Sequence, residues 1–161
     1  MSLPLYRYTR RESMEVIMAE KRYLLMSIKP VYAKKIKAKT KTIELRCSSP
    51  KVSSGDILVI YESSPIQRIT AYCNIDSVIS MSPEKLWEAV KEKAGIAKDA
   101  FEEYFSGKQE GVGICLKNIN MLSVPQPLSV IAEDFSAPQS YRYISEEQFR
   151  RIVSVGISSE M

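Results

Sequence analysis

The 161-residue chain contains no histidine. Nucleophilic sites of the Ser-His-Asp and Cys-His types need an imidazole base, so both are excluded. Metal centres that use histidine ligands are excluded for the same reason. Any chemistry must therefore depend on lysine, carboxylate, tyrosine, hydroxyl or thiol groups, and we predict neither a metal ion nor another cofactor.

The chain has only three cysteines, Cys47, Cys73 and Cys115, and they lie far apart. No CxxC pair is present, and an odd, scattered set gives no disulfide framework. Reduced thiols of this kind are typical of the cytoplasm, where we expect the protein to reside. All three cysteines fall in predicted strands, which favours buried structural residues.

Long hydrophobic runs are also missing. No stretch approaches the roughly 18 to 20 apolar residues that cross a bilayer, so no membrane partner is predicted. The first residues carry scattered charges and lack the apolar region of a secretory signal. We interpret residues 1–21 as an N-terminal extension and residues 22–161 as one domain, favoured as a monomer. Its core spans residues 23–123, and a C-terminal strand and helix span residues 124–161.

The composition is typical of a packed domain, with 45% hydrophobic and 26% charged residues. Helices are predicted over residues 30–39, 82–95 and 97–106, and from Ser145 onward. Strands are predicted over residues 22–29, 41–47, 57–63, 67–81, 110–123 and 140–144. Strands and helices do not alternate regularly and no glycine-rich phosphate loop is present. This order favours an α+β fold, a small β-barrel of about five to seven strands with covering helices.

Positive charge is concentrated in one segment. Residues 30–46 hold six basic residues against the single acidic Glu44, a net charge of +5, whereas the whole chain carries +4. A local basic patch favours an anionic partner, most often nucleic acid, although a solvated helix face is the alternative. The candidate patch consists of Lys34, Lys35, Lys37 and Lys39.

The end of this segment, KTIELR, has the alternation of a half-buried strand. Ile43 and Leu45 are expected to face the core, which places Thr42, Glu44 and Arg46 on the other face. An arginine fork can bind a phosphate or a base edge. Its glutamate neighbour can orient that fork or accept a hydrogen bond from an exocyclic amine. The alternative is a plain ion pair that closes the end of the barrel.

The segments SIKPVYAKKIKAKTKTIELR and GDILVIYESSP together resemble the ASCH domain, a member of the PUA-like superfamily, over about residues 23–144. The hallmark of that family is a GxKxxExR motif, in which Lys41, Glu44 and Arg46 take the charged places. Lys39 stands where the family has glycine, so a positive φ is less expected there. The resemblance implies a β-barrel with a cleft beneath a helix, in a family associated with RNA and transcription coactivation.

The resemblance further implies that the cleft binds RNA or a modified nucleoside. The ligand-binding candidates are Lys41, Thr42, Glu44, Arg46, Ser63, Ser64, Tyr141 and Arg142, with Gln139 and Ser140 at the edge. Two of these assignments have structural alternatives. The serines before Pro65 also suit a turn that ends a strand, and Tyr141 also suits the core.

An enzyme is the competing interpretation. One ASCH branch, the N4-acetylcytidine amidohydrolases, uses a lysine, a threonine two residues before the motif arginine and a distant glutamate. Lys41 matches the lysine, but Glu44 stands at the threonine place, and Ala94 and Gly95 stand near the glutamate place. In a hydrolase acting on a modified nucleoside or on RNA, Lys41 and Glu44 are the catalytic candidates. Neighbouring lysines are expected to lower the pKa of Lys41, and Glu44 in contact is expected to raise it. A protein-binding domain is a further alternative.

Overall fold

The computed structural model describes residues 21–157, so nearly all of the predicted N-terminal extension lies outside the described residues. The elements are β1 (Tyr23–Ile28), α2 (Pro30–Lys37), β2 (Ile43–Arg46), β3 (Ile57–Glu62), β4 (Arg68–Met81), α3 (Pro83–Val90), α4 (Lys98–Tyr104), β5 (Gly111–Gln126), the 3-10 turn η1 (Leu128–Val130), β6 (Tyr141–Ile144) and α5 (Glu146–Ile157). This α+β order confirms the predicted fold class.

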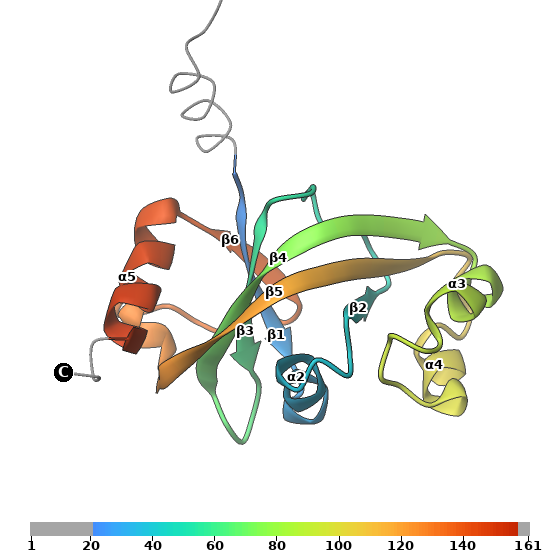
Figure 1. Ribbon diagram of the computed structural model, residues 1–161, viewed down its shortest axis with the longest axis horizontal. Helices are drawn as coiled ribbons and strands as arrows, with labels where there is room; N and C mark the ends of the chain where they lie inside the picture. The colour runs from blue at the N-terminus through green and yellow to red at the C-terminus, as the bar shows by residue number, and fades with distance from the viewer. Residues whose placement is uncertain (1–20, 158–161) are drawn as a thin grey trace, which may run out of the picture.

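The six strands form one sheet in the order β2-β5-β4-β3-β1-β6. The sheet curls into a half-barrel, with α5 at one end and the α3–α4 pair at the other (Figure 1). β1 and β3 run parallel, and the other neighbouring strands pair antiparallel. All six residues of β3 are buried, because β3 lies in the middle of the sheet between β4 and β1.

Helices cover the apolar faces that the curled sheet leaves open. Ala33 and Ile36 of α2 pack into the main cluster inside the half-barrel. Phe149 of α5 packs against a second cluster, and Leu86 and Phe101 of α3 and α4 join a third cluster with β2. The α3–α4 pair therefore rests on β2, the strand that carries the charged motif.

Two sequence predictions need correction. The strand predicted over residues 110–123 is longer than expected, since β5 continues past Pro125 to Gln126. β2 pairs only with residues 112–115 of β5, so no strand of the described residues pairs with Pro125 on that side of β5. The missing backbone N–H of proline therefore breaks no hydrogen bond there. The three cysteines are not equally buried: only Cys73 is fully buried, and burial raises its thiol pKa to about 12.

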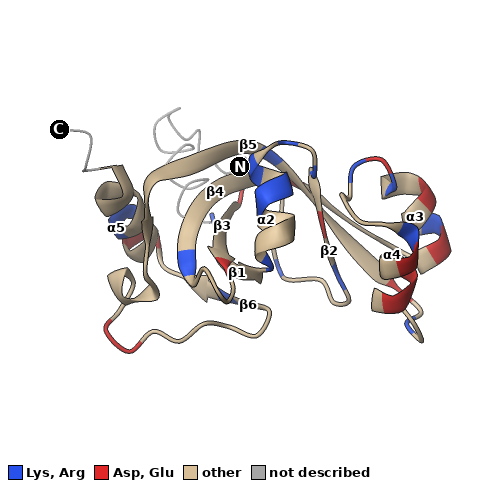
Figure 2. Cartoon of the chain, turned by 90° about the horizontal axis from the view of Figure 1, so that it is seen from below, with Lys and Arg blue, Asp and Glu red and all other residues tan. Residues whose placement is uncertain are grey.

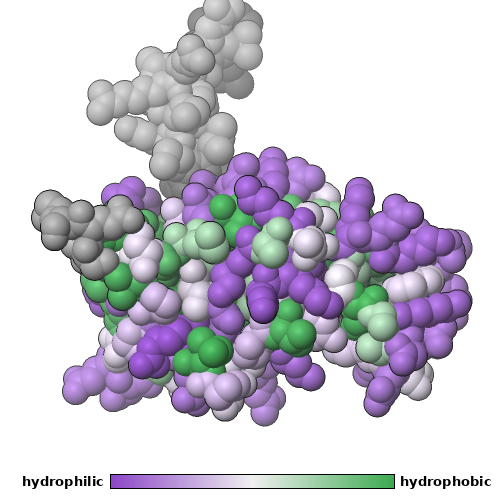
Figure 3. All heavy atoms as spheres, turned by 60° about the horizontal axis from the view of Figure 1, so that its bottom comes forward, coloured by the Kyte–Doolittle hydropathy of each residue, from purple (hydrophilic) through white to green (hydrophobic). Residues whose placement is uncertain are grey.

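Charge is distributed unevenly over the surface. Lysines stand out on α2, whereas acidic residues gather on α3 and α4 (Figure 2). On the face in Figure 3, hydrophobic side chains form separated patches among hydrophilic ones. Within residues 21–157, no helix has the length and apolar character needed to cross a membrane.

Candidate functional site

A pocket of about 590 Å³ opens between the end of β1, α2, β2 and α4. Its lining residues are Ser27, Ile28, Lys29, Tyr32, Lys41, Glu44, Leu45, Arg46, Ser63, Ile96, Ala100, Glu103, Tyr104 and Gln139. Small-molecule sites usually have volumes of about 300–1,000 Å³, so the space suits a nucleotide. We call this cavity the motif pocket because all three charged residues of the sequence motif line it.

Lys41 is almost fully buried, with 2% of its surface exposed. Its ammonium group lies 5.3 Å from the centre of the Tyr32 ring, within the range of a cation–π contact. Burial is the main cause that lowers the pKa of Lys41, and the positive charge of Lys35 adds to it, while Glu44 opposes it. From the sequence we expected neighbouring lysines to lower this pKa, but they are a secondary cause after burial.

Two lysines attach the turn after α3 to the rest of the site. Lys35 Nζ donates to the Gly95 carbonyl at 2.8 Å, and Lys41 Nζ donates to the Ala94 carbonyl at 2.5 Å. Gly95 has a φ of +62°, and a Cβ atom there would lie 2.9 Å from Lys41 Cβ. Glycine is therefore required at this position, and Lys41 has a structural role in addition to any functional one.

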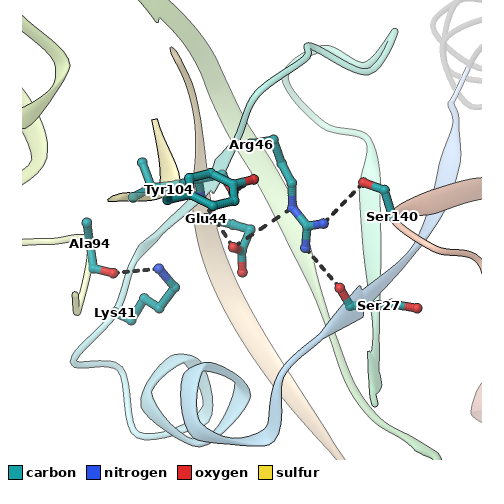
Figure 4. Close-up of polar contacts among 8 residues, drawn as sticks. Ser27, Lys41, Glu44, Arg46, Ala94, Tyr104 and Ser140 are labelled. Atoms are coloured by element: carbon teal, nitrogen blue, oxygen red, sulfur yellow. Dashed lines mark hydrogen bonds and ion pairs between the residues drawn. The ribbon is translucent and has the colours of Figure 1, made fainter. Parts of the chain in front are cut away.

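Glu44 and Arg46 point toward one another within the motif pocket (Figure 4). Their closest contact, between Arg46 Nε and Glu44 Oε1, is a loose 3.9 Å. The arginine fork is held more tightly by other groups, since it donates to Ser140 Oγ at 3.1 Å and to the Ser27 carbonyl at 2.9 Å. The hypothesis that glutamate orients the guanidinium is therefore incomplete.

Two buried atoms of this pair have no hydrogen-bond partner among the described residues: Glu44 Oε2 and Arg46 Nε. A buried polar group without a partner costs about 1–3 kcal/mol, and more when it is charged. Both residues line the motif pocket, and a ligand that brings one donor and one acceptor can satisfy both atoms once the two side chains turn toward it, since neither atom is exposed. Within the described residues, no group of three or more Cys, Asp or Glu residues is arranged to hold a metal ion.

Tyr104 lies at the rim of the pocket rather than in the core. The i, i+3, i+4 spacing of Phe101, Tyr104 and Phe105 predicts three core residues, but Phe101 and Phe105 are buried whereas Tyr104 is 43% exposed. Burial of the hydroxyl, with help from Cys47, raises the Tyr104 pKa to about 12, so the phenol stays neutral. The i, i+3, i+4 pattern of these aromatics could not distinguish the residue at the edge of the helix face.

The structure brings only part of the predicted site together. Lys41, Glu44, Arg46 and Ser63 line the motif pocket, as does Gln139, whereas Thr42, Ser64, Tyr141 and Arg142 do not. Thr42 precedes β2 and lines a separate hollow of about 260 Å³. Tyr141 packs against the main core, and the Arg142 guanidinium stacks 3.8 Å from the Phe135 ring centre.

The predicted basic patch is not one free surface. Lys34 and Lys39 are exposed, but Lys35 bonds to Gly95 and Lys37 pairs with the buried Glu62 at 2.5 Å. Two of the four lysines are therefore engaged in contacts within the fold.

Several pocket residues were missed from the sequence: Ser27, Lys29, Tyr32, Ile96, Ala100, Glu103 and Tyr104. The first three belong to the SIKPVY segment that carried the family resemblance, which is the signal that pointed to them. The others come from α4 and the turn before it, and only tertiary packing places them opposite β2.

Comparison with known proteins places this chain in a family. The ASCH domain model matches residues 26–125, so the protein belongs to the ASCH domain family. The chain is 22% identical over 139 residues to an ASCH domain-containing ribonuclease of Zymomonas mobilis, across 84% of this chain and 93% of that protein.

Solved structures share the fold. The crystal structure of ASCH from Zymomonas mobilis has a TM-score of 0.78 at 22% identity and covers 83% of this chain and 94% of that chain. The N-terminal domain of Staphylothermus marinus McrB has a TM-score of 0.56 at 11% identity and covers 82% of this chain and 93% of that chain. At these identities the likeness establishes the fold alone.

Proposed function

We propose that this protein binds single-stranded RNA and takes one unpaired nucleotide into the motif pocket. The carrying observation is the buried, unpartnered pair of atoms Glu44 Oε2 and Arg46 Nε. An acceptor beside a donor complements a nucleobase edge, which also presents donors and acceptors side by side. Proteins that read RNA usually recognise unstacked bases in single strands, because those edges are accessible.

The rim of the pocket supplies the other contacts that a nucleotide needs. Tyr32 and Tyr104 line it and offer aromatic faces on which a base can stack. The exposed Lys29 lines it too and offers a cation for a phosphate. The relative from Zymomonas mobilis is described as a ribonuclease, which supports RNA as the ligand class.

The binding test compares a fluorescein-labelled single-stranded RNA with a duplex of the same sequence by fluorescence anisotropy. The single strand should bind more tightly, because bases in the duplex are stacked and cannot enter the pocket. Its affinity should fall with salt by a log–log slope of about −0.7 for each phosphate contacted. Equal affinity for the duplex, or no binding at low salt, would count against the proposal.

RNA cleavage is the second candidate function, favoured by the lowered pKa of Lys41 beside Glu44 and by the named activity of the relative. In this route the Glu44 carboxylate removes the proton of a ribose 2′-hydroxyl, and the 2′-oxygen attacks the adjacent phosphorus. The bond from phosphorus to the 5′-oxygen breaks, and that oxygen takes a proton from the Lys41 ammonium group. The products are a 2′,3′-cyclic phosphate and a 5′-hydroxyl end.

Mass spectrometry of the products tests this second function. RNA should be cleaved to cyclic phosphate ends, and Glu44→Gln should abolish cleavage because an amide cannot accept the proton. RNA methylated at the 2′-oxygen should resist, since it has no nucleophile. Cleavage of the methylated RNA, or a Glu44→Gln variant as fast as the wild type, would refute the route.

The amidohydrolase alternative has less support. The place of the family's distant glutamate falls at Ala94 and Gly95, and the carbonyl groups of both accept hydrogen bonds from lysines. Lys41 is therefore held by a backbone oxygen and not by a carboxylate from that segment. A modified nucleoside remains one form of the unpaired nucleotide that the motif pocket is proposed to bind.

A further inference from the structure

A second pocket, of about 410 Å³, lies at the opposite end of β1 and β6 from the motif pocket. Its lining residues are Lys21, Arg22, Tyr23, Lys51, Tyr143, Ile144, Ser145 and Glu146. β1 reaches the motif pocket at Ser27 and the second pocket at Tyr23, and β6 runs antiparallel beside it. The two cavities are therefore joined by the length of one strand pair.

Two chain segments run from one pocket to the other, and we call the surface they form the seam: residues 46–51 and residues 140–143. At the motif pocket they are tied by the bond from Arg46 to Ser140 Oγ at 3.1 Å. At the second pocket the Lys51 N–H donates to the Tyr143 hydroxyl oxygen at 2.9 Å. Three residues of extended β6 separate the two ties, a distance of about 10 Å at roughly 3.3 Å per residue. A strand of two or more nucleotides can place a base in each pocket over this distance.

The seam carries positive charge only. Residues 45–55 and 135–145 contain no aspartate or glutamate, and they hold Arg46, Lys51 and Arg142. On the other side of the motif pocket, residues 83–104 hold six acidic residues against four lysines, and red stretches mark the acidic positions on the cartoon of α3 and α4 (Figure 2). The phosphates of a strand in the motif pocket are thus repelled from α3 and α4 and attracted toward the seam.

The second pocket has the groups that bind single strands without regard to sequence. Tyr143 is 45% exposed, and the exposed Arg22 and Lys51 line the same pocket. Arg22 Nη1 donates to the Lys51 carbonyl at 2.8 Å, so the guanidinium is held in position. Glu146 lines the same pocket, but its carboxylate pairs with Arg150 at 2.7 Å. Aromatic rings that stack bases, flanked by cations for phosphates, are typical of such sites.

We infer that the RNA strand leaves the motif pocket along the seam and stacks a second base on Tyr143, with Arg22 and Lys51 neutralising its phosphates. The exposed hydroxyl-bearing residues Ser48 and Ser49 lie between the two ends of this path. The inference rests on the proposed function and adds to it the class of substrate: an extended single strand of several nucleotides, and not a free nucleotide or nucleoside.

The test uses a ring substitution that separates stacking from hydrogen bonding. Tyr143→Leu removes the aromatic face, whereas Tyr143→Phe keeps the ring and removes only the hydroxyl. The probes are a fluorescein-labelled single-stranded RNA of about ten nucleotides, methylated at its 2′-oxygens to prevent cleavage, and the four nucleoside monophosphates. Tyr143→Leu should weaken binding of the long probe by about 10-fold, and Tyr143→Phe should stay near wild type.

Lys51→Ala is an independent variant, because Lys51 hydrogen-bonds to Tyr143 through its backbone N–H and carbonyl, which the substitution leaves in place. It should reduce the salt slope of the long probe by about 0.7, whereas Lys85→Ala, an equal charge change on the exposed face of α3, should not. None of these variants should change the affinity for the nucleoside monophosphates.

The outcomes separate this inference from the proposed function. If Tyr143→Leu and Lys51→Ala bind the long probe as the wild type does, while Glu44→Gln does not, the second subsite is refuted and the motif pocket stands. If wild-type protein binds neither probe, both proposals fail. Loss of monophosphate binding in Tyr143→Leu would also overturn the inference, because it would show damage to the motif pocket rather than loss of a second contact.

Discussion

At the scale of single residues, Lys39 adopts a backbone conformation that glycine usually provides. Its φ is 66°, in the left-handed region, where a residue with a Cβ atom is less stable by about 1–2 kcal/mol. The absence of glycine made a positive φ less expected at this position, and that expectation is wrong. The turn from α2 into β2 therefore has a positive φ at a lysine.

Lys39→Gly should therefore stabilise the protein by about 0.5–1 kcal/mol, because relief of the strained φ outweighs the greater freedom of the unfolded chain. Urea denaturation measures the change in the free energy of unfolding. Lys34→Gly, at an exposed position within α2, is the matched control and should destabilise by a similar amount. A Lys39→Gly protein less stable than the wild type would show that the side chain makes a contact worth more than the strain.

Sequence spacing found the motif residues because three charges at fixed intervals belong to one short strand and its approach. Lys41, Glu44 and Arg46 all line the motif pocket as a result. The partners of Arg46 were not predictable in the same way, since Ser27 and Ser140 lie 19 and 94 residues away. Local patterns carry no information on which distant hydroxyl or carbonyl a guanidinium will meet.

At the scale of elements, helices and strands were predicted closely, whereas their mutual positions were not. Turn residues and apolar periodicity act within a few positions, so they predicted both α3 and α4. Nothing local indicates that α4 lies over β2, which is what places Tyr104 and Glu103 in the motif pocket. The tie between these parts depends on Lys41, which bonds to the turn after α3.

This tie predicts a pH dependence of stability. Burial lowers the Lys41 pKa in the folded protein, so between that value and the ordinary 10.5 the unfolded chain binds more protons. The contribution of Lys41 to the free energy of unfolding should consequently rise with pH through this window, by at most about 1.4 kcal/mol per pH unit.

Urea denaturation of the wild type and of Lys41→Met, from about pH 7 to about pH 10, isolates this contribution. The stability of the wild type relative to Lys41→Met should increase as the pH rises, because the buried lysine loses its charge. Other titrating groups are common to both proteins and cancel in the difference. A stability difference that is flat or falls with pH would mean that the pKa of Lys41 is not lowered in the folded protein.

At the scale of the whole molecule, Arg46 joins the two free edges of the curled sheet. It extends from β2, one edge strand, to β1 and to Ser140 just before β6, the other edge strand. Removing its side chain would open this junction and break the buried pair of Glu44 and Arg46, at a cost of about 3–5 kcal/mol. Arg46→Ala would therefore lose stability and binding together, so it cannot distinguish a structural role from a functional one.

Glu44→Gln makes that distinction, and Glu62→Gln is its matched control. Both glutamates are buried, with 6% and 4% exposed, but Glu62 lies outside the motif pocket and pairs with Lys37. The affinity for single-stranded RNA and the free energy of unfolding are measured for each variant. Removing a negative charge by itself would strengthen RNA binding. Weaker binding by Glu44→Gln would therefore show that a specific contact with the RNA has been lost.

Glu44→Gln should weaken RNA binding per folded molecule by about 10-fold or more, because a buried acceptor for the base edge is lost. Glu62→Gln should lose stability through its broken pair with Lys37 and keep its affinity per folded molecule. RNA affinity in Glu44→Gln equal to or greater than that of the wild type would contradict the claim that the motif pocket binds the nucleotide through Glu44.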